Sequence, residues 1–94
     1  MYLAIVTLVP GAATPRQPID EQVLVDVLWT RVTPTDRIEH ISTAVSADVI
    51  ELGFYVHAEN RREADRAARS IGDRACGTVP VLREWRPAPG ARDQ

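Results

Sequence analysis

The sequence contains no lysine, because all 11 of its basic residues are arginine. This excludes a lysine that forms a Schiff base with a carbonyl substrate. It also excludes the lysine that holds nucleotide phosphates in a P-loop. We expect the exclusive use of arginine to reflect a GC-rich genome rather than a functional choice.

Cysteine is nearly absent, with Cys76 as its single occurrence. One cysteine excludes a disulfide within the chain and every CxxC motif for metal binding or redox chemistry. We interpret Cys76 as a small residue at the end of a helix. We therefore expect no metal and no cofactor.

Strong net charge and long apolar runs are also missing. The formal net charge is −2, with 13 acidic residues against 11 basic ones, which provides no general attraction to nucleic acid or anionic lipid. The longest apolar run, YLAIVTLV at residues 2–9, is far shorter than the roughly 18 residues of a membrane span, and no basic segment precedes it. We expect a cytoplasmic protein with neither a membrane nor a nucleic acid as partner.

The residues that are present predict one compact domain over residues 1–87 and a flexible tail over residues 88–94. The second helix is predicted to begin after an N-cap at Asn60 and to end at Gly77. The predicted elements are strands at 2–9, 37–45, 49–58 and 78–85, and helices at 18–32 and 60–77.

This order of elements, βαββαβ, resembles the ferredoxin-like superfold. The resemblance implies an α+β domain in which two helices cover one face of a four-stranded antiparallel sheet, and it covers about residues 2–86. A resemblance of architecture implies no particular function.

Alternation along ELGFYVHAEN (residues 51–60) decides which side chains face the helices. Phe54 and its apolar neighbours point inward, so Tyr55 and His57 point to the opposite, open face of the sheet. A hairpin that pairs Val45 with Ile50 also places His40 on the open face. The paired residues are then His40 with Tyr55 and Ile38 with His57.

His40, Tyr55 and His57 are therefore candidate catalytic residues, in which the imidazoles exchange protons and the phenol orients an oxygen. The alternative is that they only cover a half-exposed sheet. Glu39, a conceivable third ligand for a metal, faces the other way in this register. The candidate ligand-binding residues are Trp29, Ile38 and Trp85.

Two surfaces predict partners. Strand 2–9 is apolar on both faces, which favours a homodimer through the open sheet face. The first helix carries a second apolar stripe of Ile19, Val23 and Val27, which either binds a partner protein or lies under the neighbouring loop or the tail. Arginines of the second helix form a solvated face, or, less favoured, dock an acidic partner such as a carrier protein.

Two hypotheses of function remain. The first is a small, non-catalytic dimeric accessory protein that binds a small molecule or a partner protein. The alternative is a cofactor-free enzyme that resembles antibiotic-biosynthesis monooxygenases or polyketide cyclases, which enclose an aromatic substrate in a dimeric ferredoxin-like domain.

Overall fold

The computed structural model describes residues 1–11 and 18–88. Within them the chain forms four strands, two helices and two short 3-10 turns. The strands are β1 (Tyr2–Pro10), β2 (Ile38–Val45), β3 (Ile50–Val56) and β4 (Trp85–Pro87). The helices are α1 (Glu21–Trp29) and α2 (Arg61–Thr78), and the turns are η1 (Pro34–Asp36) and η2 (Pro80–Leu82).

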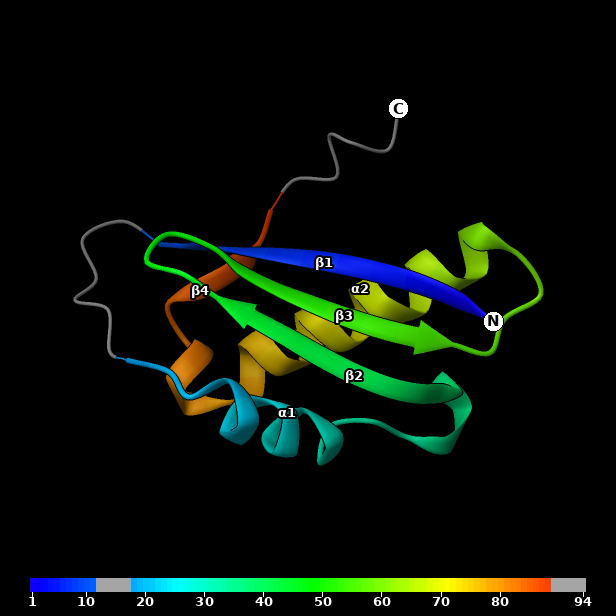
Figure 1. Ribbon diagram of the computed structural model, residues 1–94, viewed down its shortest axis with the longest axis horizontal. Coiled ribbons are helices and arrows are strands. Elements are labelled where there is room, and N and C mark those ends of the chain that lie inside the picture. Colours follow the sequence, from blue (N-terminus) through cyan, green and yellow to red (C-terminus); the bar gives the residue numbers. More distant parts are fainter. Residues whose placement is uncertain (12–17, 89–94) are drawn as a thin grey trace.

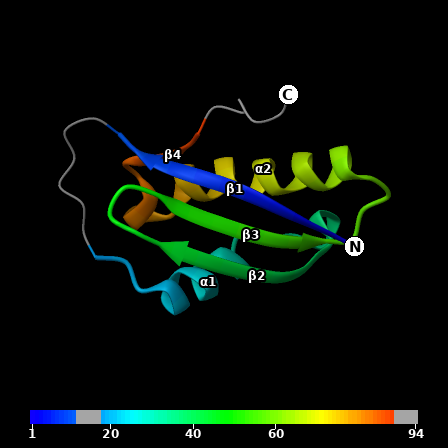
Figure 2. The ribbon, with the colours of Figure 1, turned by 45° about the horizontal axis from the view of Figure 1, so that its top comes forward.

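The sheet has the order β2-β3-β1-β4, and every neighbouring pair of strands is antiparallel. β1 and β3 are therefore the two central strands. α1 contacts β2, and α2 packs along β1 (Figures 1 and 2). This α+β arrangement is consistent with the ferredoxin-like fold that the order of elements predicts.

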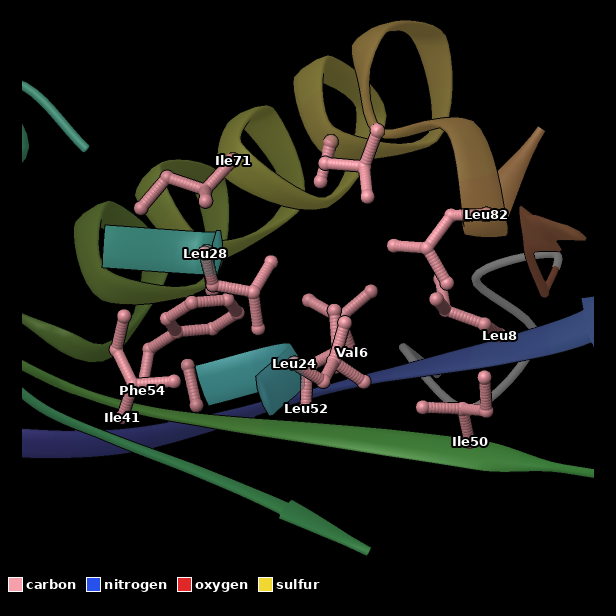
Figure 3. Packing of buried hydrophobic residues seen from close by; sticks show 14 of the residues in the cluster. Val6, Leu8, Leu24, Leu28, Ile41, Ile50, Leu52, Phe54, Ile71 and Leu82 are labelled. Atoms are coloured by element: carbon pink, nitrogen blue, oxygen red, sulfur yellow. The ribbon is translucent and has the colours of Figure 1, made fainter. Parts of the chain in front are cut away.

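The core lies between the sheet and the two helices (Figure 3). In β1 the buried residues are Ala4, Val6 and Leu8, whereas Leu3 and Ile5 are exposed, so the strand buries one face only. In β3 Leu52, Phe54 and Val56 are buried and Tyr55 is exposed. Within the described residues, both helices therefore cover the same face of the sheet and leave the other face open.

α1 is shorter than the predicted helix 18–32. It begins at Glu21 because Asp20 is the N-cap, and the Asp20 carboxylate accepts hydrogen bonds from the backbone N–H groups of Gln22 and Val23. Glu21 connects the start of α1 to β2, because the Glu21 carboxylate accepts a hydrogen bond from the Val45 backbone N–H at 2.8 Å. The helix ends at Trp29 rather than at residue 32.

α2 begins as predicted, with Asn60 as its N-cap. The Asn60 side chain accepts the Glu63 N–H at 2.8 Å, and the Glu63 carboxylate accepts the Glu59 N–H at 3.0 Å, a variant of the capping box. The predicted end at Gly77 is wrong, because the helix continues through Thr78 and Val79 caps it. None of the helices in the described residues is long and apolar enough to cross a membrane.

The last strand is displaced from its predicted position at 78–85. Pro80 starts the turn η2 instead, and β4 covers only Trp85–Pro87. Arg86 and Pro87 thus belong to the sheet, and Ala88, which the sequence assigns to the tail, donates its N–H to the Thr7 carbonyl at 2.7 Å. The rest of the predicted tail, residues 89–94, lies outside the described residues.

Candidate functional site

The centre of the open sheet face is apolar. Leu3, Ile5 and Tyr55 are between 38% and 51% exposed there. Gly53 lies among them, opposite Ile5 on β1 and Ser42 on β2. A Cβ atom at Gly53 would be 3.5 Å from Leu3 Cδ1 and 3.6 Å from Ile5 Cδ1, so these two side chains flank the glycine closely and make the apolar surface continuous.

His40 and Tyr55 lie next to each other on this face. The predicted hairpin register is confirmed, since Val45 pairs with Ile50 and His40 pairs with Tyr55. The two rings are tilted by 59°, and their centroids are 5.8 Å apart. The phenol and the imidazole thus form a polar border on the apolar centre.

His57 has a neighbour that the sequence did not predict. A β-bulge between Ile38 and His40 leaves Glu39 without a paired residue and moves Ile38 opposite Val56, so the predicted pairing of Ile38 with His57 is wrong. The bulge redirects Glu39, which the sequence predicted to face away, so that its Oε2 lies 3.5 Å from His57 Nε2.

The bulge is held by Arg37, which has a left-handed backbone with φ of 58°. Its carbonyl accepts the His57 backbone N–H at 2.9 Å, which ties the start of β2 to the end of β3. The His57 and Glu39 side chains remain 63% and 49% exposed. The described residues of a single chain therefore leave this imidazole–carboxylate pair open to solvent.

The three predicted ligand-binding residues are not gathered around these side chains. Trp85 is only 7% exposed and belongs to the core. Ile38 is half-buried against the same core, and Trp29 is exposed at the end of α1. The structure thus separates all three from the open-face centre.

The predicted second stripe of α1 is mostly occupied by the protein itself. Ile19 precedes α1, so its predicted place on the helix is wrong. Ile19 and Val27 are half-buried and pack against the core, whereas Val23 is 57% exposed. Of the three predicted partner-binding residues, Val23 presents the largest surface to a partner.

Metal-ligating and nucleophilic side chains are dispersed. Across residues 1–11 and 18–88, no three His, Cys, Asp or Glu side chains come close enough to hold a metal ion. Burial raises the pKa of the half-buried Cys76 thiol to about 11, with a smaller contribution from the charge of Asp73. This thiol is therefore protonated and a weak nucleophile at neutral pH.

A groove between β1 and α2 is a feature that the sequence reasoning missed. It has a volume of about 760 Å³ and is open to solvent. Its lining comprises Ile5, Val6 and Thr7 of β1, Arg61, Arg62, Asp65, Arg66 and Arg69 of α2, and Pro87 and Ala88. The signal against a strand at 78–85 was Pro80, which starts the turn η2 and leaves β4 to begin only at Trp85.

Comparisons of the chain with protein-family models, with curated proteins and with solved structures find no match. Within the described residues, the open sheet face and the groove beside α2 are candidate surfaces for function.

Proposed function

We propose that the protein is a small, non-catalytic dimeric binding protein in which a second copy of the chain covers the open sheet face. The observation that carries this proposal is the exposure of Leu3 and Ile5 on the central strand, beside Tyr55. Complete burial of an aliphatic side chain stabilises by roughly 1.5–3 kcal/mol. A continuous apolar surface in the middle of a sheet therefore favours association.

The composition of the face suits contact between two identical copies. A symmetric interface places the same residues on both sides, so a charge at its centre would meet its own copy. The row of Ile5, Gly53 and Ser42 across the open face carries no charge, and the charged Glu51 lies in the next row, opposite Thr7. Two copies can thus approach without like charges facing each other at the centre.

The test is the mass of the purified protein in solution, measured by light scattering. We expect twice the chain mass of 10.4 kDa. Ile5→Glu should give the mass of one chain with an unchanged circular dichroism spectrum, because it introduces a charge into the apolar centre. Val23→Glu is the matched control, since Val23 is 57% exposed against 51% for Ile5 but lies on α1.

The two variants distinguish an interface on the open sheet face from one on α1. A dimer that resists Ile5→Glu but dissociates with Val23→Glu would move the interface to α1. A wild-type protein with the mass of one chain at all concentrations would contradict the dimer.

A cofactor-free enzyme is the second candidate, and the contact between Glu39 and His57 favours it. The Glu39 carboxylate lies 3.5 Å from the His57 imidazole, where it can orient the ring of a general base. The test is turnover of a hydroxylated polycyclic aromatic compound. His57→Ala should abolish turnover and Glu39→Gln should lower it, both at unchanged mass, whereas equal rates in both variants and the wild type would exclude this role.

A further inference from the structure

The edge of β1 that faces β4 is paired only near its end. β4 pairs with Leu8, Val9 and Pro10, and Ala88 adds one hydrogen bond to the Thr7 carbonyl. Farther back, the Leu3 carbonyl accepts a hydrogen bond from the Arg61 side chain. Since alternate residues of a strand point their backbone groups to the same edge, Ile5 also presents its N–H and C=O there.

Within the described part of the chain, no backbone group pairs with Ile5 at this edge. Unpaired N–H and C=O groups of this kind are a template for another strand. An added strand would lie about 4.8 Å from β1. That position is the groove between β1 and α2.

The helical wall of the groove is positively charged. Arg62, Arg66 and Arg69 follow one another at spacings of four and three residues, which places them on one face of α2. Arg61 lies 3.6 Å from Asp65, whereas in the described residues no hydrogen bond or ion pair engages the other three arginines. In a chain of net charge −2, this is a local cluster of uncompensated positive charge.

The two faces of an added strand would meet different surroundings. One set of alternate side chains would point toward α2 and its arginines. The other set would point to the open face, beside the exposed side chains of Leu3 and Ile5. The groove therefore matches a strand in which acidic and apolar residues alternate.

We infer that this groove binds an extended, acidic segment of a partner protein as an additional strand on the edge of β1. The inference rests on the binding role proposed above and names a partner for it. A second copy of the chain is a poor occupant, because pairing two such edges would bring the arginine clusters of both copies together. A nucleic acid could neutralise the arginines, but it has no strand of N–H and C=O groups to pair with Ile5.

In the first experiment, the protein is titrated into a fluorescent octapeptide of alternating Glu and Val, and binding is measured by fluorescence anisotropy. We expect saturable binding that weakens as salt is added. A peptide of the same composition with four Glu followed by four Val should bind at least about tenfold more weakly, since it cannot place all its charges on one face. An equal affinity of the two peptides would overturn the inference.

Backbone methylation separates strand addition from attraction by charge alone. All Glu amides of the peptide point to one edge of the strand and all Val amides to the other. Methylation of one set should therefore abolish binding, and methylation of the other set should leave it unchanged. Retention of binding by both methylated peptides, or its loss in both, would contradict an added strand.

Variants of the protein locate the site. Replacing both Arg62 and Arg66 by Gln should weaken binding of the alternating peptide by about tenfold. Arg83→Gln, at an exposed arginine outside the groove, should leave it unchanged. Equal effects of the two changes, or equally tight binding of an oligonucleotide, would indicate a non-specific attraction of anions and overturn the inference.

The solution mass, measured in parallel, distinguishes failure of the dimer proposal from failure of the strand-binding proposal. A single-chain mass with normal peptide binding would contradict the dimer alone. A dimer without peptide binding would overturn the strand site alone. Dissociation of the dimer on addition of the peptide would show that a second copy occupies this edge, and would also overturn the inference.

Discussion

At the scale of single residues, Asp36 is the carboxylate on which several segments converge. Its Oδ2 accepts hydrogen bonds from the Thr33 N–H at 2.7 Å and from Arg74 Nη1 at 3.1 Å. Arg74 Nη1 also donates to the Arg31 carbonyl at 2.6 Å, which connects α2 to the segment after α1. Burial raises the pKa of Asp36, but the hydrogen bonds from Thr33 and Arg74 outweigh it, so the pKa lies below its usual value.

We expect Asp36→Asn to lower the free energy of unfolding at pH 7 by about 1–2 kcal/mol, because it removes a charged acceptor of several hydrogen bonds. The contribution of the ionised carboxylate is complete above the unfolded-state pKa of about 3.9, and it is lost as the pH falls through the lower folded-state pKa. The difference between variant and wild type should therefore shrink at the most acidic pH at which both still fold.

Urea denaturation at pH 7 and at acidic pH measures this difference. Asp26→Asn is the control, because Asp26 is exposed on α1 and its change should stay within about 0.5 kcal/mol. A gap between Asp36→Asn and wild type that is the same at both pH values would contradict a contribution from the ionised carboxylate.

At the scale of elements, the close approach of α2 to β1 depends on Gly72. A Cβ atom at this position would lie 2.9 Å from Val6 Cγ1, within the buried core. Gly77 lies in the same helix but is exposed, and nothing is within 4 Å of its Cβ position. Alanine at Gly72 therefore tests the packing of α2 against β1, and alanine at Gly77 tests helix propensity alone.

We expect Gly72→Ala to destabilise the protein by about 1–2 kcal/mol, because the overpacked methyl group displaces Val6. Gly77→Ala should stabilise it by about 0.5–1 kcal/mol, the usual gain of alanine in a helix. A double-mutant cycle that combines Gly72→Ala with Val6→Ala can be measured by chemical denaturation. The double variant should be less destabilised than the sum of the two single variants, because the smaller side chain at position 6 makes room for the methyl group at position 72. Independent, additive effects of Val6→Ala and Gly72→Ala would show that the two positions do not limit the packing.

At the scale of the whole molecule, the folded chain is small and leaves apolar surface in the middle of its sheet. A domain of 94 residues buries a smaller share of its surface on folding than a larger one. The exposed Leu3 and Ile5 are surface that the described residues of a single chain do not bury. Association should therefore contribute to the stability of the folded state.

We expect the Tm of the wild-type protein to rise with protein concentration over about a hundredfold range, because mass action favours a folded dimer. Differential scanning fluorimetry measures this rise. Ile5→Glu should remove the concentration dependence, and Val23→Glu should retain it. A wild-type Tm that is constant over the whole range would contradict dimer-linked folding.

Local patterns in the sequence were sufficient for the βαββαβ order, the Asn60 cap, and the pairings of Val45 with Ile50 and His40 with Tyr55. Alternation of apolar residues decides which face of a strand is buried, and a short hairpin leaves few possible registers. The sequence was therefore sufficient to predict that the candidate residues His40 and Tyr55 lie side by side on the open face.

Only the tertiary structure decided the contact between Glu39 and His57, the burial of Trp85 and the groove beside α2. The bulge at Glu39 depends on how the start of β2 meets the end of β3, through the left-handed backbone of Arg37. The position of β4 depends on how the turn η2 packs its buried Leu82. These features arise from contacts between segments far apart in the chain, which local alternation and propensity do not encode.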